Sequence, residues 1–416
     1  MTSKNCVEQW GQSLNFNHEM KNYGTDPLAP DALFLRKILL LLFLSVSFCS
    51  ANLRAADAPT ITVRKSDAIN VAFMNFSGSD GAAVAKIFSN DLALAGWLHV
   101  EPVGKASFVI TGTASGGALQ GKVVDRSGSI VLSKSYAGDP RAMAHHFCND
   151  IVETLTGHPG IAMSKIAFVS TRTGRKEIDT ADYDGSNGRQ ITHDNGISVS
   201  PSLSPSGHEL AYTGYLSGYA DIYLIDLATG ARQRLVKYPG TNSGPRFSPD
   251  GNRLACTLSK DGRPGLYVVG IHGGLLRLTR TRGAESCGTW SPNGAELIYS
   301  SDENGSPQLY RISASGGTGR LVSTGFGYAT EPNWSPDGQH VAFNVRSGGA
   351  FAVAVLDLGS GSARIVAQGE NPVWGPDSRH LLFSTHNALV LFDVQSGKSI
   401  PVVSGLGEVT EPTWSR

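Results

Sequence analysis

Acidic, amide and hydroxyl side chains recur in short stretches that come directly before a repeated aromatic turn motif. Such groups bind cations and make hydrogen bonds to a docked protein. We expect these stretches to form loops that converge on one rim of the molecule, where they would create a docking site. The candidate partner-binding residues are Thr241, Asn242, Ser286, Tyr328, Glu331, Glu370 and Glu411.

The sequence lacks the motifs that would turn this rim into an active site. It contains no Gly-x-Ser-x-Gly nucleophile elbow, no His-Glu-x-x-His metal motif and no phosphate-binding Gly-x-x-x-x-Gly-Lys-Ser/Thr loop. His145 and His146 are adjacent, and neighbouring residues on a helix point about 100° apart, so they are not expected to share one metal ion. We predict no catalytic residues and no cofactor. One hypothesis left open is a Ca²⁺ ion, because carboxylates and loop carbonyls suit this cation.

The elements that must position the rim are indicated by the repeated motif. Its best copy is Trp334-Ser335-Pro336-Asp337-Gly338, a turn signal that leads into the apolar strand Val341–Phe343. The steps between successive copies are 44, 43, 44, 40 and 40 residues, and a period of this length indicates stacked or radially repeated units. The large apolar residue of each copy is Leu203, Phe247, Trp290, Trp334, Trp374 or Trp414.

Two incomplete copies suggest that the repeats close into a ring. The strand Ile166–Phe168 has no turn in front of it, whereas Pro412–Arg416 has only the first half of the motif. The second half-repeat can complete the unit that begins at Ser164, and closure hides the edges that an open sheet exposes. We therefore predict a mainly β protein with a six-bladed β-propeller of four-stranded blades at residues 161–416. An open solenoid and a β-sandwich are the alternatives, and neither explains the paired half-repeats.

Residues 57–160 lack the repeat and are predicted to form a small α/β domain. Strands are expected at Thr60–Val63 and Ile69–Phe73, and three more in a meander after residue 107. One helix is expected over residues 80–96 with Asp80 as its N-cap, and a second helix begins at Asp139-Pro140.

Residues 1–56 are predicted to be a leader that ends in a secretory signal peptide. Arg36-Lys37 precedes a short apolar run, and small residues follow, with cleavage expected after Ala51 or Ala56. The charges balance at 35 basic and 35 acidic residues, which gives no electrostatic basis for binding nucleic acid.

Several stretches resemble the TolB family of the Tol-Pal system. The repeated Trp-Ser-Pro-Asp-Gly motif is similar to that family's propeller repeat, and the resemblance covers about residues 57–416. The departures are Asp179, where the family usually has an aromatic residue, Gly375 and Ser378 in the fifth motif, and Cys287-Gly288. The stretches that resemble the family's domain junction are Ser164–Ser170, Thr171–Gly174, Lys176–Ile178, Asp182–Gly185 and Arg189–Thr192.

The resemblance implies a non-enzymatic adaptor in the periplasm. It implies that the propeller mouth binds the peptidoglycan-associated lipoprotein Pal and that the N-terminus of the mature chain binds TolA. Other outer-membrane proteins are further candidate partners, and association with the membrane would be peripheral, through partners. The implied role is outer-membrane integrity and constriction at cell division.

Two other classes of function were weighed against the adaptor. A hydrolase or lyase built on the propeller would need paired carboxylates and histidines with shifted pKa values in the channel. A peptidoglycan-binding module would need aromatic platforms at the mouth, where Tyr328 is one such residue.

Overall fold

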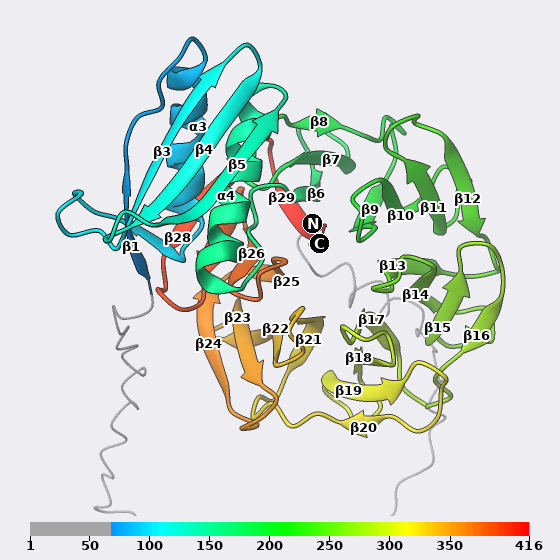
Figure 1. The fold of residues 1–416 in the computed structure, drawn as a ribbon. Helices are drawn as coiled ribbons and strands as arrows, with labels where there is room; N and C mark the ends of the chain where they lie inside the picture. The colour runs from blue at the N-terminus through cyan, green and yellow to red at the C-terminus, as the bar shows by residue number, and fades with distance from the viewer. Residues whose placement is uncertain (1–67, 416) are drawn as a thin grey trace, which may run out of the picture. The chain divides into compact units, whose positions relative to one another are not determined.

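The structure is a computed structural model that describes residues 68–415. Within these residues the strands form one five-stranded sheet and six four-stranded sheets, and the six are arranged in a ring (Figure 1). The predicted six-bladed β-propeller preceded by a small α/β region is confirmed. The leader, the signal peptide and the predicted strand Thr60–Val63 lie outside the described residues. The described chain contains no helix that is both long and apolar enough to cross a membrane.

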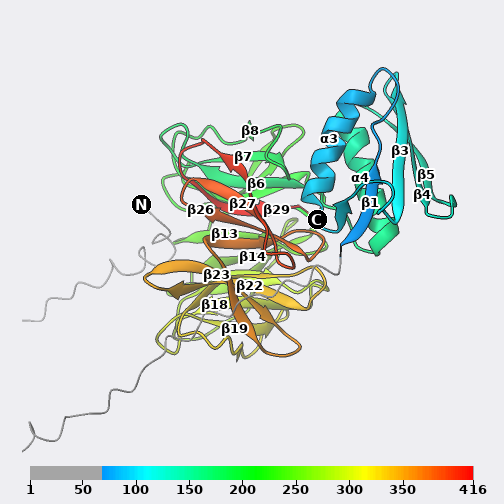
Figure 2. The same ribbon diagram turned by 90° about the vertical axis from the view of Figure 1, so that its left-hand side faces the viewer.

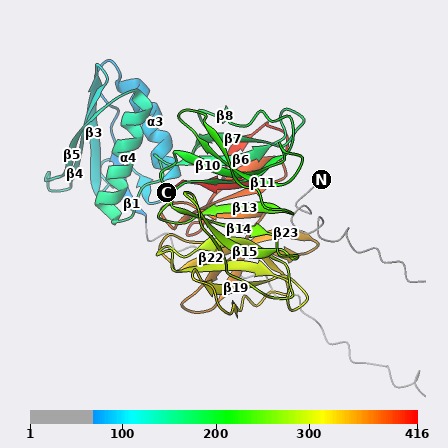
Figure 3. The same cartoon turned by 90° about the vertical axis from the view of Figure 1, so that its right-hand side faces the viewer.

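The five-stranded sheet has the order β2-β1-β3-β4-β5. β1 pairs in parallel with β2 and β3, while β3, β4 and β5 form the predicted antiparallel meander. Both helices cover the same face of this sheet (Figures 2 and 3). The bounds are β1 Ile69–Phe73, α3 Gly81–Leu94, β2 Leu98–Val100, β3 Phe108–Ser115, β4 Ala118–Asp125, β5 Ile130–Ala137 and α4 Pro140–Thr156.

The two helices begin differently. Asp139 caps α4 as predicted, because its carboxylate accepts hydrogen bonds from the Arg141 and Ala142 N–H groups at 2.8 and 2.9 Å. Asp80 occupies the N-cap position of α3 as predicted, but its side chain makes no capping hydrogen bond. The Asp80 carboxylate instead accepts from the Gly117 N–H at 3.1 Å, in the turn between β3 and β4.

The six propeller sheets are named blades 1 to 6, each from its inner to its outer strand. Blade 1 contains β29 Val409–Trp414, β6 Lys165–Ser170, β7 Glu177–Asp182 and β8 Arg189–Gln190, and blade 2 contains β9 Ser198–Leu203, β10 Glu209–Gly214, β11 Asp221–Asp226 and β12 Arg232–Val236. Blade 3 contains β13 Asn242–Phe247, β14 Arg253–Leu258, β15 Gly265–Gly270 and β16 Leu275–Arg277, and blade 4 contains β17 Glu285–Trp290, β18 Glu296–Ser301, β19 Gln308–Ser313 and β20 Arg320–Leu321. Blade 5 contains β21 Ala329–Trp334, β22 His340–Ser347, β23 Ala350–Asp357 and β24 Ala363–Gln368, and blade 6 contains β25 Glu370–Trp374, β26 His380–Thr385, β27 Ala388–Asp393 and β28 Ser399–Ser404.

Blade 1 joins the two ends of the propeller. β29 is antiparallel to β6, with Trp414 opposite Ile166, and the Trp414 indole N–H donates to Ser164 Oγ at 2.6 Å. Gly375 in the turn of the neighbouring blade makes room for this indole, because a Cβ at that position would lie 3.0 Å from the Trp414 ring. The departure from the repeated Ser at position 375 therefore has a steric cause.

The repeated turn is held by its own side chains. In blade 5, Ser335 Oγ accepts from the His340 N–H and Asp337 Oδ1 accepts from the Gln339 N–H, both at 2.9 Å. Gly338 has a φ of 76°, in the left-handed region that glycine adopts without strain. These bonds explain why the sequence Ser-Pro-Asp-Gly recurs where an inner strand turns into the next strand.

A buried polar cluster joins the two helices to the start of blade 1. The Asp91 carboxylate on α3 lies 2.7 Å from His145 Nδ1 on α4 and accepts from the Tyr183 hydroxyl at 2.7 Å. All three side chains are buried. Burial raises the pKa of Asp91, although the hydrogen bond and charge of His145 oppose this increase.

Candidate functional site at the two ends of the inner strands

The inner strand of each of the six blades carries a β-bulge at the same position relative to the repeated turn motif. The first bulge residue lies three positions before the large apolar residue of the motif. In five of the six blades this first bulge residue has a left-handed backbone, with φ between 52° and 61°. The five residues are Ser200, Gly244, Glu331, Asn371 and Glu411. The conformation disfavours residues with a Cβ, so four of the five positions carry backbone strain.

A proline follows the bulge residue in five of the six copies. Proline has no N–H to contribute to a ladder, and within sheets it is tolerated at bulges and edges. The motif is thus longer than the aromatic turn, and it begins with an X-Pro pair that marks the bulge. The prolines are Pro201, Pro245, Pro332, Pro372 and Pro412.

The bulge residues make a hydrogen-bonded chain from blade to blade, which we call the mouth chain. Asn371 Nδ2 donates to Glu331 Oε2 at 2.7 Å, and the Glu411 N–H approaches Asn371 Oδ1 at 3.4 Å. The Ser200 N–H donates to Glu411 Oε2 at 2.6 Å. The mouth chain links blades 5, 6, 1 and 2. It fixes two carboxylates near the heads of the inner strands, at the end of the propeller that we call the mouth.

The mouth chain does not continue to blade 3. Gly244 occupies the equivalent position in blade 3 and has no side chain that could continue the chain. Its N–H donates to Thr213 Oγ1 on β10 of blade 2, at 3.0 Å. The mouth is therefore asymmetric, with a cross-linked acidic side and a side without bulge carboxylates.

The seven predicted site residues occupy four different registers of the inner strands. Relative to the large apolar residue, Thr241 and Tyr328 lie six positions before it, and Asn242 lies five before it. Ser286 and Glu370 lie four before it, and Glu331 and Glu411 lie three before it. The expectation that these stretches are loops is corrected, because all except Thr241 and Tyr328 lie within the first three residues of inner strands.

Asn242 differs from the other six because its side chain is fully buried. Its Nδ2 donates to the Ala220 and Tyr238 carbonyls at 3.0 and 2.8 Å, and its Oδ1 accepts from the Tyr238 N–H at 3.0 Å. These bonds fasten the head of β13 to neighbouring loops. Asn242 is thus a structural residue, whereas the other six side chains are partly exposed.

Tyr328 is covered on one face by a cation. The Arg346 guanidinium carbon lies 4.5 Å from the centre of the Tyr328 ring. Burial raises the pKa of the Tyr328 hydroxyl, which keeps it neutral. With one face occupied by Arg346, this ring is a poor stacking platform for a sugar.

Glu285, which adjoins the predicted site residue Ser286 and was not itself predicted, is a buried acid at the mouth end of blade 4. It occupies the same register as Asn242, and the Thr279 hydroxyl donates to Glu285 Oε2 at 3.1 Å while Thr281 donates to the other oxygen. Desolvation raises the pKa of Glu285, and the two hydroxyls partly offset this effect. The register could have identified it, since both residues head an inner strand.

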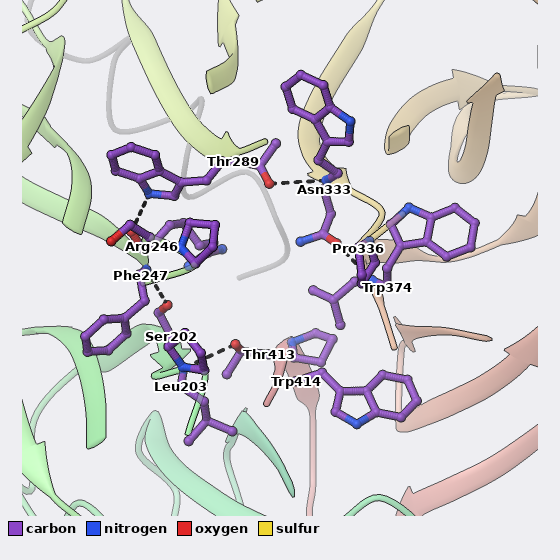
Figure 4. Close-up of a pocket in the computed structure, with 17 residues that line it drawn as sticks. Ser202, Leu203, Arg246, Phe247, Thr289, Asn333, Pro336, Trp374, Thr413 and Trp414 are labelled. Carbon is purple, nitrogen blue, oxygen red and sulfur yellow. Dashed lines mark hydrogen bonds between the residues drawn. The ribbon is translucent and has the colours of Figure 1, made fainter. Parts of the chain in front are cut away.

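At the other end of the inner strands, next to the repeated turns, the six blades enclose a cavity of about 80 Å³ (Figure 4). Ligand pockets usually measure about 300–1,000 Å³, so this cavity is too small for a sugar or a cofactor. We call it the turn-end cavity. Its polar lining consists of Ser202, Arg246, Thr289, Asn333 and Thr413, together with the Ser248 hydroxyl group.

Hydrogen bonds from blade to blade surround the turn-end cavity. The residue that precedes the large apolar residue of the motif uses its side-chain oxygen to accept a hydrogen bond. The donor is the backbone N–H of the large apolar residue in the next blade. Ser202 accepts from Phe247 at 3.1 Å, Thr289 from Trp334 at 3.2 Å, Asn333 from Trp374 at 2.8 Å and Thr413 from Leu203 at 3.3 Å. Within residues 68–415 no such bond is made at the two positions where the preceding residue is Arg246 or Val373.

The described residues hold no cluster of three or more His, Cys, Asp or Glu side chains that could bind a metal ion. His145 is buried against Asp91 whereas His146 is exposed, as the helix geometry predicts. At the mouth, one oxygen each of Glu331 and Glu411 already accepts a hydrogen bond. These residues give the Ca²⁺ hypothesis no carboxylate cluster.

Comparison with known proteins identifies a family that shares the propeller and its repeat. A family model described as the TolB β-propeller domain matches residues 152–416. A TolB homologue of Chlorobaculum tepidum is 36% identical over 171 residues, which cover 38% of this chain and 37% of the relative. The Tol-Pal system protein TolB of Desulfosudis oleivorans is 37% identical over 186 residues, which cover 42% of each chain. The chain thus spans less than half the length of these curated relatives.

One solved structure is similar over most of the described chain. The crystal structure of TolB from Acinetobacter baumannii superimposes with a TM-score of 0.75 at 25% sequence identity. The match covers 84% of this chain and 96% of that one, so it includes the region before the propeller.

Proposed function

Because the chain belongs to the TolB β-propeller family, we propose that it is a periplasmic adaptor of the Tol-Pal system that performs no catalysis. The observation that carries the proposal is the mouth chain, which holds Glu331 and Glu411 in fixed positions on one side of the mouth. A rigid, charged rim favours recognition of a folded partner, because little side-chain entropy is lost on binding.

The proposed partner at the mouth is the lipoprotein Pal. The heads of the inner strands bring Thr241, Ser286, Tyr328 and Glu370 to the same end of the propeller as the two mouth-chain carboxylates. A partner that covers these six positions would contact several blades, as an interface of standard size requires. The asymmetry of the mouth would fix the orientation of the partner, since only one side presents bulge carboxylates.

The proposed second partner is TolA, which would bind the N-terminus of the mature chain. Signal cleavage after Ala51 or Ala56 would leave a polar segment ahead of the described residues. We assign residues 57–160 to the α/β domain and residues 161–416 to the propeller. Engagement of Pal and TolA by separate parts of the chain would support outer-membrane integrity and constriction at division.

The test at the mouth is a titration of Pal against the wild type and against Glu331→Gln and Glu411→Gln. Glutamine keeps an oxygen acceptor for the mouth chain and removes only the charge, so thermal stability should change little. We expect both variants to bind Pal several-fold more weakly, mainly through a slower association rate that added salt mutes. Thr241→Ala and Ser286→Ala should weaken binding less.

The matched control is Glu209→Gln, a partly exposed carboxylate that begins β10 at the turn end of blade 2. It should bind Pal like the wild type. Wild-type affinity in all four mouth variants would move the docking site elsewhere. A loss of affinity accompanied by an equal loss of melting temperature would show that these residues support the propeller and do not bind the partner.

The test of the second partner is a chain that lacks residues 57–63. We expect it to lose capture of TolA while it keeps the Pal affinity of the parent. Retained TolA capture would contradict the assignment of the N-terminal segment.

A further inference from the structure

The turn-end cavity has a hydrogen-bonding character of its own. Ser202, Thr289 and Thr413 each use their side-chain oxygen to accept an N–H from the next blade. A hydroxyl has one hydrogen to donate, and the three hydrogens have no acceptor within residues 68–415. All three side chains are at least nine-tenths buried, with exposures of 3%, 8% and 8%.

The side chain of Asn333 adds another donor. Its Oδ1 accepts from the Trp374 N–H at 2.8 Å, which fixes the orientation of the amide. Figure 4 shows that the amide nitrogen is directed into the cavity. In the described chain this NH₂ group has no hydrogen-bond acceptor.

A single cation completes the lining. Arg246 uses Nη1 to donate to the carbonyls of Pro201 and Pro245 at 3.3 and 3.0 Å, which anchors one edge of the guanidinium. Among the described residues, the other guanidinium N–H groups have no acceptor and no carboxylate forms an ion pair with Arg246. Figure 4 shows Arg246 and Asn333 on opposite sides of the cavity.

We propose that the turn-end cavity is a binding site for a carboxylate. A carboxylate is an acceptor-only group, and the unpaired polar groups of Arg246, Asn333 and the three hydroxyls are all donors. The prolines and indoles around them suit the one or two carbons attached to such a group. A cavity of about 80 Å³ admits the end of a molecule and not the whole of a sugar or nucleotide.

The carboxylate belongs either to a small free acid or to an acidic side chain or C-terminus that a protein inserts into the channel. The chemistry at the site is the same in both cases. The inference does not depend on Pal binding, because no residue of the mouth chain is among those that line the turn-end cavity.

Tryptophan fluorescence offers a direct test, because four of the six tryptophans line the cavity: Trp290, Trp334, Trp374 and Trp414. The full chain is titrated at constant ionic strength with acetate, with acetamide, with inorganic phosphate and with the peptide acetyl-Gly-Gly, which ends in a free carboxylate. We expect a saturable response to acetate and none to acetamide, which has the same shape without the charge. Tighter binding of the peptide than of acetate would indicate a protein source, and the reverse would indicate a free acid.

Two variants separate binding from folding. Arg246→Met should weaken acetate binding at least about tenfold, as loss of a charge-assisted contact does. Asn333→Asp keeps the acceptor for the Trp374 N–H but places a negative charge in the cavity, so it should abolish acetate binding even if Arg246→Met does not fold. The control is Arg364→Met, at an exposed arginine on the outer strand β24.

Four results would overturn the proposal. These are the absence of a saturable acetate response in the wild type, an equal response to acetamide, wild-type acetate affinity in Asn333→Asp, and saturable binding of phosphate in place of acetate.

Discussion

The two ends of the inner strands follow one rule and reach opposite results. At both ends a side-chain oxygen of one blade accepts a backbone N–H of the next blade, and the sense around the ring is the same: Glu411 accepts from Ser200, and Thr413 accepts from Leu203. At the mouth the acceptors include the carboxylates of Glu331 and Glu411, which are acceptor-only groups. At the turn end they are hydroxyls and an amide, which leave donors. Two residues of spacing along a strand thus separate an acceptor-rich rim from a donor-rich cavity.

The largest loss of stability should come from a deletion that removes the mouth residue and the turn-end residue of one inner strand together. Deletion of residues 411–416 removes Glu411 and Thr413 together with most of β29, which leaves blade 1 with three strands and exposes the edge of β6 that β29 covers. We expect the propeller to lose its cooperative thermal transition or to melt far below the parent. A melting temperature equal to that of the parent would show that the ring does not depend on this strand.

The next largest effect belongs to the turn end. Trp334 is 4% exposed, so Trp334→Ala should lower the free energy of unfolding by about 3–5 kcal/mol, the usual range for a buried large aromatic residue. Urea denaturation measures this change. A loss below about 1 kcal/mol would mean that the indole contributes no more than a surface side chain.

The inter-blade bonds of the turn end can be tested with a matched pair of substitutions. Thr289→Val leaves the buried Trp334 N–H without an acceptor and should cost about 1–2 kcal/mol. Val373→Thr supplies the missing acceptor at the equivalent position of blade 6 and should be neutral or stabilise by up to about 1 kcal/mol. Equal destabilisation in both variants would indicate that packing, and not the hydrogen bond, determines stability at this register.

The smallest effect concerns the strained backbone of the mouth. Ser200 has a φ of 53°, and only its N–H takes part in the mouth chain. Ser200→Gly should therefore stabilise the fold by about 0.5–1 kcal/mol, because glycine adopts this conformation without a steric penalty. Ser202→Gly is the control, and it should destabilise by removing the acceptor for Phe247. A destabilised Ser200→Gly variant would mean that the strain at the bulge is negligible.

The sequence was sufficient to predict the number of blades, because the large apolar residue marks one fixed point in every repeat. Family membership agrees with the resemblance on which the adaptor was predicted and with the prediction of a non-enzymatic protein. The rim was located less well. Its residues were expected to lie in loops, although the X-Pro pair, visible at Glu331-Pro332 and Glu411-Pro412, marks the bulge register.

Other features depend on contacts that no local pattern encodes. The need for Gly375 arises from Trp414, which reaches it from the neighbouring blade. Asp179, where an aromatic residue was expected, is buried and forms an ion pair with Arg172 at 2.7 Å. The donor character of the turn-end cavity appears only when each hydroxyl is matched with the N–H that occupies its oxygen.

The pairing of β6 with β29 also has a consequence for the order of folding. The hydrogen bond from the Lys165 N–H to Ser415 Oγ joins residues 250 positions apart. Contacts of such long range form slowly, because most of the intervening chain must be ordered before they can form. Blade 1 therefore stays incomplete until the other five blades have been synthesised.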